Sequence, residues 1–444
     1  MQYAWLWAVK GEIEMIVPFV FTLATYSEAP YLWFFYKWLD TCKKHCWPMI
    51  AQEVYFRSPK YFARQGYPPA FEKKIADRFE YSLPKERDLN MVQKHQIPEK
   101  LIEKLVEEKG SYSDASAFLL THSYSPLVEW IDMHIQKIQK HSKEPIEAFS
   151  VLQHLPSLSV AAEKYQIPVI HNEMGPFRQP NYLKTNFWDL DNIFGGHTIE
   201  ERYRQFCAEQ QKCGAPLFTG EEILSLFLLP EQLDVLKRLR TSRFVRKIGV
   251  ALGNVMDPVN SSKTRFNDNE LLYRLERKYG MERLLLRRHP GDPYGAQYPR
   301  YSGCIQPAKE SLFDFILQCE TIASIGSNVV IEAMYYGRKG YIFTPCPSYY
   351  AASNRFDEDP VCADDTFLSF FALGYLIPYI GMTDLAYIRW RLSNPSEMEI
   401  YNRHLKFYLD KKNIPESVLS EKRGKRLELM VKAQCSKPEC KEIP

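Results

Sequence analysis

The residues best suited to chemistry lie in two segments that are each expected to follow a β-strand. One is Arg288-His289-Pro290, in which His289 could bind a phosphate or protonate a leaving phosphate. The other is a turn that opens a helix, and it contains Ser324, Gly326, Ser327 and Asn328. Such a turn offers free backbone N–H groups to an anion, and Glu332, one helical turn further on, could accept ribose hydroxyls. Plain helix capping by Ser and Asn remains the simpler alternative.

Two carboxylates and an arginine follow two other expected strands. Asp257 lies in a loop after the strand 247–252 and could act as a nucleophile or base, although an Asx turn before Pro258 is the commoner use of that pattern. Glu173 follows the strand 167–171 and could act as an acid or base. Arg178 could hold a substrate carboxylate through two hydrogen bonds, or simply pair with Glu173 on the loop.

The elements that position these residues alternate between strands and helices. Apolar runs predict strands at 16–24, 146–152, 167–171, 247–252, 283–287, 321–323 and 340–344. Amphipathic segments predict helices at 267–279, 311–319 and 327–337. This alternation predicts an α/β fold with parallel, doubly wound sheets. Because ligands bind beyond the carboxyl ends of such strands, the polar segments are expected to converge on one crevice.

Composition restricts the class of protein. The chain has 444 residues, of which 45% are hydrophobic and 25% charged, as expected for two domains with ordinary cores. The net charge of +3 argues against nucleic acid as the main partner. None of the ten cysteines forms a Cys-x-x-Cys pair, so we expect reduced thiols in a cytoplasmic protein and no zinc site.

Three further segments bear on metals and membranes. Asp189-x-Asp191 could pair two carboxylates on a cation, but its apolar neighbours favour packing, and no metal is expected. No apolar run is long enough to span a bilayer, and residues 1–14 are expected to be a dispensable extension. The basic run Lys422–Arg426 is ordinarily a solvated face; alternatively it contacts anionic lipid, which would place the protein peripherally at the inner membrane.

Taken in order, these motifs resemble the retaining β-Kdo transferases of glycosyltransferase family 99. The resemblance rests on four motifs. They are Glu173 before Gly-Pro-Phe-Arg (175–178), Asp257 in the loop after Val-Ala-Leu (250–252), Arg-His-Pro (288–290), and Ser-x-x-Ser-Asn-x-x-x-Glu-Ala (324–333). It covers the chain from about Met15 to about Asp384. More distantly, the motifs are similar to those of capsule Kdo transferases and bacterial sialyltransferases, which use a His-Pro motif and a serine motif on CMP.

The resemblance implies a fold of the GT-B type. It would have two Rossmann-like domains, an interdomain cleft and C-terminal crossover helices. The boundaries would be an acceptor-side domain at 1–240, a CMP-sugar domain at 241–385, and helices packing back at 386–444.

The resemblance also implies a reaction, which is transfer of Kdo from CMP-β-Kdo to a glycan acceptor of a bacterial surface polysaccharide, without a cofactor. Asp257 would be the nucleophile that forms a covalent adduct, and Glu173 the base toward the acceptor. His289 and Arg288 would bind the CMP phosphate together with the serine motif, and Arg178 the sugar carboxylate. Two alternatives stay open: an inverting CMP-sugar transferase in which Asp257 is only a base, and a non-catalytic glycan-binding scaffold.

Overall fold

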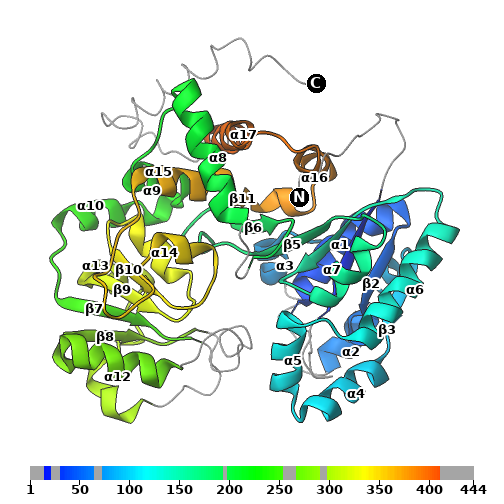
Figure 1. Cartoon of the computed structure of the whole chain (residues 1–444), viewed down its shortest axis with the longest axis horizontal. Coiled ribbons are helices and arrows are strands. Elements are labelled where there is room, and N and C mark those ends of the chain that lie inside the picture. Colours follow the sequence, from blue (N-terminus) through cyan, green and yellow to red (C-terminus); the bar gives the residue numbers. More distant parts are fainter. Residues whose placement is uncertain are drawn as a thin grey trace. The chain divides into compact units, whose positions relative to one another are not determined.

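The computed structural model describes residues 15–21, 31–64, 73–193, 198–253, 267–290 and 298–410. Contacts divide the chain into two compact units, one ending at Ile170 and the other beginning at His171. Each unit contains parallel β-strands flanked by helices (Figure 1). The predicted α/β class with two Rossmann-like sheets is therefore confirmed.

The N-terminal unit is built on four parallel strands in the order β3-β2-β1-β4, which is the order of a Rossmann-type half sheet. Its elements are β1 (Met15–Val20), α1 (Leu32–His45), β2 (Pro48–Gln52), α2 (Pro59–Arg64), α3 (Lys73–Phe79), β3 (Gln93–Ile97), α4 (Glu99–Lys109), α5 (Tyr112–Thr121), α6 (Ser125–His141), β4 (Ile146–Leu152) and α7 (Pro156–Glu163). Every residue of β1 and β4 is buried, as expected for central strands covered on both faces.

Strand β5 (Val169–Met174) pairs with the antiparallel strand β6 (Thr185–Asp189), which in turn pairs with the short β11 (Ile377–Pro378). The hydrogen-bonded order is β11-β6-β5-β4-β1-β2-β3. Because β6 continues the ladder to Met174, β5 runs past the end predicted for it at residue 171. Glu173 therefore lies within a strand, opposite Phe187, and not in a loop after it.

The C-terminal sheet has four parallel strands in the order β10-β9-β7-β8. Its elements are β7 (Arg246–Ala251), α12 (Asp268–Tyr279), β8 (Leu284–Arg287), α13 (Leu312–Gln318), β9 (Cys319–Ser324), α14 (Val329–Met334) and β10 (Lys339–Ile342). The strand order reverses between β7 and β9, because the chain first adds β8 on one side of β7 and then β9 on the other. In open α/β sheets such a reversal is where ligands bind.

The two faces of this sheet are covered by different helices, in step with the alternation of side chains along each strand. Ile248, Val250, Leu284 and Leu286 share a buried cluster with the apolar face of α12. Ala251, Leu285 and Ile322 belong to a second cluster that includes residues of α13 and α14. This two-sided burial makes the strands near-continuous apolar runs, which is why the sequence predicted them.

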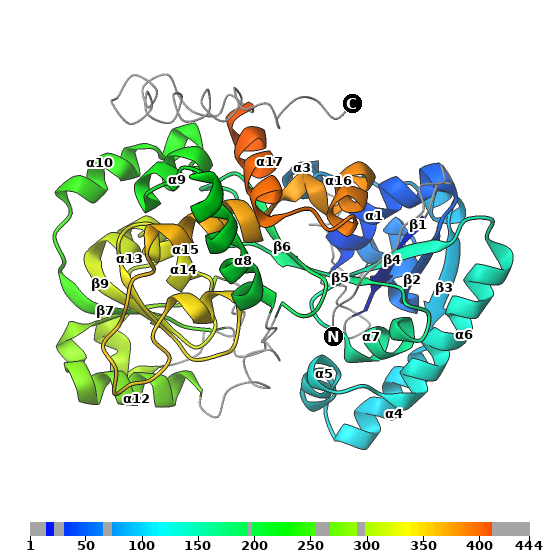
Figure 2. The same cartoon turned by 45° about the horizontal axis from the view of Figure 1, so that its top comes forward.

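The remaining helices of the C-terminal unit pack together around aromatic side chains. They are α8 (Thr198–Cys213), α9 (Gly220–Phe227), α10 (Asp234–Thr241), α15 (Asp365–Phe370), a π-helical turn (Phe371–Tyr375), α16 (Leu385–Leu392) and α17 (Glu397–Asp410). Helix α17 packs against α8, α9 and the π-helical turn (Figure 2). Contacts thus group residues 171–240 with the C-terminal sheet. The domain boundaries that the resemblance implies, at 240 and 385, stay predictions.

Two other expectations concern cysteines and membrane spans. The eight cysteines within the described ranges form no disulfide. No helix in the same ranges combines the length and the apolar character needed to cross a membrane. The N-terminal extension 1–14 and the basic run 422–426 lie outside the described residues.

Candidate functional site at the carboxyl edge of the C-terminal sheet

The ends of β7 and β9 are tied together at the point where the strand order reverses. The hydroxyl of Ser324, the last residue of β9, donates a 2.7 Å hydrogen bond to the carbonyl oxygen of Ala251, the last residue of β7. The backbone N–H of Ser327 donates to the same Ser324 hydroxyl over 3.2 Å. Ser324 is 1% exposed, so in this structure its hydroxyl stabilises the turn through buried hydrogen bonds.

The turn itself is half-buried and leads into a short helix. Gly326, Ser327 and Asn328 are each partly accessible, and α14 begins at Val329. The Asn328 side chain makes no capping hydrogen bond, while Ser327 Oγ accepts a 3.3 Å bond from the N–H of Val329. Capping by Asn328 is therefore not what holds this helix end. The helix is shorter than the predicted 327–337, because the chain turns away before Gly337, whose φ is +70°.

Glu332 lies beneath this turn in a buried polar cluster. Its side chain is 3% exposed, and Oε1 accepts a 2.5 Å hydrogen bond from the hydroxyl of Tyr182. The Tyr182 hydroxyl is also 2.8 Å from that of Tyr336. Burial raises the pKa of the Glu332 carboxyl to about 7, although the Tyr182 hydrogen bond and the positive charges of Arg178 and Arg287 oppose the shift. Glu332 can thus gain or lose a proton near neutral pH.

Arg178 is carried by a tightly held turn after β5. Phe177 is fully buried and stacks on Phe227 with ring centroids 4.6 Å apart. The carbonyl oxygen of Arg178 accepts a 3.1 Å bond from the N–H of Tyr182, which closes the turn and places both residues near Glu332. Only glycine fits at position 175, because a Cβ there would collide with the Thr185 side chain. The Arg178 side chain itself is exposed.

Arg287, the last residue of β8, supplies a second guanidinium group. Its Nη1 donates to Gln306 Oε1 over 2.7 Å and more weakly, over 3.4 Å, to the Glu310 carbonyl oxygen. Gln306 is 6% exposed and is held in turn by a 3.0 Å bond from Nε2 to the Ser311 carbonyl oxygen. Burial lowers the pKa of Arg287, and the negative charges of Glu332 and Asp314 oppose that shift. An arginine side chain keeps its positive charge in proteins.

The fixed orientation of Arg287 leaves donors available. Among the described residues no carboxylate lies within ion-pair distance of it, and its Nε and Nη2 make no hydrogen bond there. The side chain is half-buried at the carboxyl edge of the sheet. A half-buried, pre-oriented guanidinium with free N–H groups is well suited to binding a carboxylate or phosphate.

The other predicted residues have different surroundings. Arg288 and His289 are exposed just beyond the end of β8. Glu173 is half-buried in β5, and its Oε1 accepts a 2.8 Å bond from the N–H of Met174. Asp257 lies outside the described residues. The structure therefore brings Arg178 and Glu332 into electrostatic contact, and adds Arg287 to them.

The sequence did not identify Tyr182, Tyr336, Arg287 or Gln306 as site residues. Arg287 carried a usable signal, since it is the last strand residue before Arg288-His289-Pro290 and a strand end is where this fold places ligands. Tyr182 carried none, because it lies 150 residues from its partner Glu332 along the chain.

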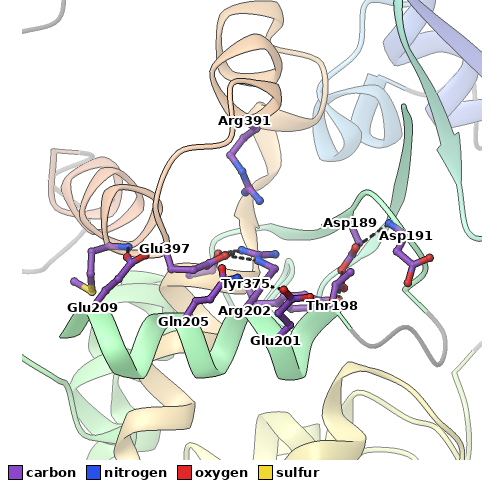
Figure 3. A network of polar contacts seen from close by, with 12 residues as sticks. Asp189, Asp191, Thr198, Glu201, Arg202, Gln205, Glu209, Tyr375, Arg391 and Glu397 are labelled. Atoms are coloured by element: carbon purple, nitrogen blue, oxygen red, sulfur yellow. Dashed lines mark hydrogen bonds and ion pairs between the residues drawn. The ribbon is translucent and has the colours of Figure 1, made fainter. Parts of the chain in front are cut away.

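The Asp189 region is a separate polar network in the same unit (Figure 3). Asp189 Oδ1 accepts a 3.0 Å bond from the N–H of Asp191, and Oδ2 accepts from the hydroxyls of Thr198 and Tyr375. Both carboxylate oxygens of Asp189 are thus occupied by protein donors. The described part of the chain holds no group of three or more His, Cys, Asp or Glu side chains arranged to bind a metal.

Comparison with known proteins adds a family match for the first part of the chain. No curated protein matches the chain. Among solved structures, a β-Kdo 2,7 transferase, KpsC of Thermosulfurimonas dismutans, has 14% identity and a TM-score of 0.35 over 66% of this chain and 86% of that one. The β-Kdo 2,4 transferase KpsC of the same organism has 12% identity and a TM-score of 0.32 over 52% and 81%.

A third similar structure is the UDP-GlcNAc 2-epimerase of Methanocaldococcus jannaschii, with 9% identity and a TM-score of 0.30 over 80% of this chain and 98% of that one. The family match ends near the start of α8 and so leaves the C-terminal sheet uncovered. Residues 17–198 match the family described as the Glycosyltransferase 99 family N-terminal domain.

Proposed function

We propose that the protein is a glycosyltransferase that moves Kdo from CMP-β-Kdo to a glycan acceptor of a bacterial surface polysaccharide. The family match over residues 17–198 supports glycosyl transfer as the reaction class. The C-terminal sheet, which the match does not cover, would bind the donor. The topology supports this assignment, because the candidate site lies where the strand order of that sheet reverses.

The observation that carries the proposal is the pair of arginines near buried Glu332. CMP-Kdo bears two anionic groups, the phosphate and the sugar carboxylate, so its binding site needs two sources of positive charge. Arg287 is pre-oriented by Gln306 and would hold the phosphate, together with His289 and the Ser327 turn. Arg178, on the exposed turn after β5, would hold the carboxylate.

The reaction would proceed by double displacement. The anomeric carbon of Kdo is quaternary and develops positive charge as CMP leaves, so a carboxylate nucleophile is suited to trap it. An Asp257 oxygen would form a bond to that carbon while the carbon–oxygen bond to phosphate breaks and its electron pair leaves with CMP. Arg287 and His289 would stabilise the departing phosphate. The acceptor hydroxyl would then lose its proton to Glu173 and displace Asp257, which restores the original configuration.

Intact-protein mass spectrometry tests this sequence of steps. The full-length protein is mixed with CMP-Kdo without acceptor and quenched in acid. We expect a species heavier by one Kdo residue, and we expect it to be absent from Asp257→Asn. Asp191→Asn is the matched control, because Asp191 lies at the separate Asp189 network and should leave adduct formation unchanged.

Two results would contradict the proposal in different ways. Turnover with CMP-Kdo and acceptor but no adduct, with Asp257→Asn inactive, would indicate an inverting transferase in which Asp257 is a base. No turnover and no binding of CMP in calorimetry would indicate a non-catalytic scaffold.

A further inference from the structure

An exposed apolar pair occupies the turn between α10 and β7. Phe244 is 52% exposed and Val245 is 66% exposed. They are adjacent in sequence, and the backbone N–H of Val245 is fixed by a 2.9 Å bond to the carbonyl oxygen of Gln318. Single exposed apolar side chains are common, whereas a fixed pair of large ones at the tip of a turn calls for an explanation.

The buried side chain of Arg338 packs against the turn that carries Phe244 and Val245. Arg338 is 5% exposed, and its guanidinium carbon lies 4.6 Å from the centre of the Phe244 ring. Its Nε donates to the Ile316 carbonyl oxygen and its Nη2 to Ser242 Oγ, over 3.1 and 3.3 Å. One face of the Phe244 ring is thus packed on a cation while the rest of the side chain is presented to solvent.

The segment of the chain that carries the pair is rich in basic residues. The basic residues of this segment are Lys237, Arg238, Arg240, Arg243, Arg246 and Lys247. Arg238, Arg240 and Lys247 form ion pairs with Asp314, Glu221 and Glu320.

Three cations of the segment have no acidic partner. Within the described ranges no carboxylate lies at ion-pair distance from Lys237, Arg243 or Arg246. Arg246 uses Nη1 on the Glu282 carbonyl oxygen, which leaves its charge uncompensated. A surface hollow beside the apolar pair is lined by Arg238, Thr241, Ser242, Arg243, Leu317 and Gln318, and by one carboxylate, Asp314, which pairs with Arg238.

We propose that this surface, the α10–β7 tip, docks the protein on an anionic lipid bilayer. Phe244 and Val245 would enter the interface between headgroups and acyl chains, and the three uncompensated cations would contact lipid phosphates. A protein partner fits less well, because a stable protein interface buries about 800 Å² on each side, far more than two apolar side chains can offer.

The position of the tip is compatible with the proposed function but independent of it. The tip lies at the amino end of β7, whereas the candidate site lies at the carboxyl end of the same sheet. Six residues of extended strand separate the two edges, or about 20 Å. A bilayer bound at the tip would therefore leave the carboxyl edge of the C-terminal sheet accessible.

Vesicle sedimentation with the full-length protein tests the proposal. The vesicles contain either phosphatidylcholine alone or equal parts of phosphatidylcholine and phosphatidylglycerol. We expect binding to the anionic vesicles only. The charge reversals Lys237→Glu and Arg243→Glu together should weaken it roughly tenfold or more. Val245→Ser should weaken it severalfold, and since that side chain is the more exposed of the pair, the fold should be unaffected.

Matched controls separate this surface from a general effect of charge or polarity. Lys60→Glu combined with Lys104→Glu reverses two charges that are 75% and 65% exposed in the N-terminal unit, and Met133→Ser removes an apolar side chain that is 54% exposed. All three substitutions should leave vesicle binding within about twofold. The proposal is wrong if the wild-type protein ignores anionic vesicles or if the tip variants bind like the controls. It is equally wrong if only substitution of the C-terminal run Lys422–Arg426 abolishes binding.

Discussion

Two buried networks in the C-terminal unit, one around Arg202 and one around Glu332, both combine arginine, carboxylate and tyrosine side chains. They differ in how these side chains are paired. In the network of Figure 3, Arg202 binds Glu397 through Nε and Nη2, over 2.7 and 3.1 Å, and its Nη2 also reaches the Gly374 carbonyl oxygen. Its guanidinium lies 5.1 Å from the centre of the Tyr375 ring, whose hydroxyl donates to Asp189. The charges of Arg202, Glu397 and Asp189 thus each meet an opposite charge or a hydrogen-bond donor inside the protein.

The Glu332 network is open, in the sense that its carboxylate forms no ion pair among the described residues, whereas Arg202 and Glu397 form one. Glu332 is bound by a tyrosine hydroxyl, and among the described residues no arginine forms an ion pair with it. Arg287 and Arg178 act on it only through their charge. One of these arginines is exposed and the other is half-buried.

The pKa shifts reflect this difference. Burial alone would lower the pKa of Arg202, but the Glu397 carboxylate raises it above its usual value, so the ion is held in place. Burial raises the pKa of Glu332 to about 7, which means that the charged form of this carboxyl is destabilised in the folded protein. The comparison teaches that the Arg202 network stabilises the fold, whereas the buried Glu332 carboxyl, which forms no ion pair with the arginines near it, is a candidate for a binding site.

The largest effect should follow from breaking the closed network. Glu397→Gln leaves the Arg202 charge buried without its carboxylate, and we expect a loss of about 3 to 5 kcal/mol in the free energy of unfolding. Chemical denaturation followed by circular dichroism measures it. The control Glu282→Gln removes a carboxylate that is 76% exposed and should change the stability by less than about 0.5 kcal/mol. Equal stability of the two variants would show that the Arg202 pair does not support the fold.

The next effect concerns the pH dependence of stability at Glu332. A carboxyl whose folded-state pKa is raised from 4.5 to about 7 binds more protons in the folded than in the unfolded chain between these values. The wild type should therefore lose stability as the pH rises through this window, by about 3 kcal/mol in total.

Glu332→Gln removes this titration. Its stability relative to the wild type should increase by about 3 kcal/mol between pH 4.5 and pH 8, because glutamine stays neutral throughout. Denaturation curves at a series of pH values test this. A difference that is constant with pH would mean that Glu332 is ionised in the folded protein over the whole range.

The smallest effect should come from Tyr182→Phe. This change removes the hydroxyl that donates to Glu332 and costs about 1 kcal/mol. Because the same hydrogen bond lowers the pKa of Glu332, its loss should move the pH window of instability upward. Tyr336→Phe is the control variant, because the Tyr336 hydroxyl contacts that of Tyr182 and forms no hydrogen bond with Glu332 within the described residues. An unchanged window in Tyr182→Phe would contradict the proposed role of the hydroxyl.

The fold was largely predictable where burial on two faces produces continuous apolar runs. Strands β7, β8 and β9 belong to this class, and each was located within a few residues. Two of the strands that the sequence did not reveal, β3 and β6, consist mostly of polar residues. Strand β3 alternates exposed and buried residues at one edge of its sheet, and β6 reads Thr-Asn-Phe-Trp-Asp. Pairing with a neighbouring strand overrides local preference in both.

The candidate site was predictable in part for a related reason. Arg178 and Glu332 drew attention because their residue types follow expected strands and turns, which is local information. Tyr182 and Gln306 act through partners in other elements, so only the three-dimensional structure connects them with Glu332 and Arg287. The convergence of all four polar segments on one ligand stays a prediction, since Asp257 lies outside the described residues.

Calorimetric titration of the full-length protein with CMP tests the central claim most directly, namely that the open network at the carboxyl edge of the C-terminal sheet binds the donor. We expect one CMP per chain, and affinity at least tenfold weaker in Arg287→Met, because a charged hydrogen bond contributes about 1.5 to 3 kcal/mol. Arg283→Met removes a 62% exposed arginine just before the same strand and should bind CMP like the wild type. Absence of CMP binding, or equal affinity in the two variants, would contradict the account.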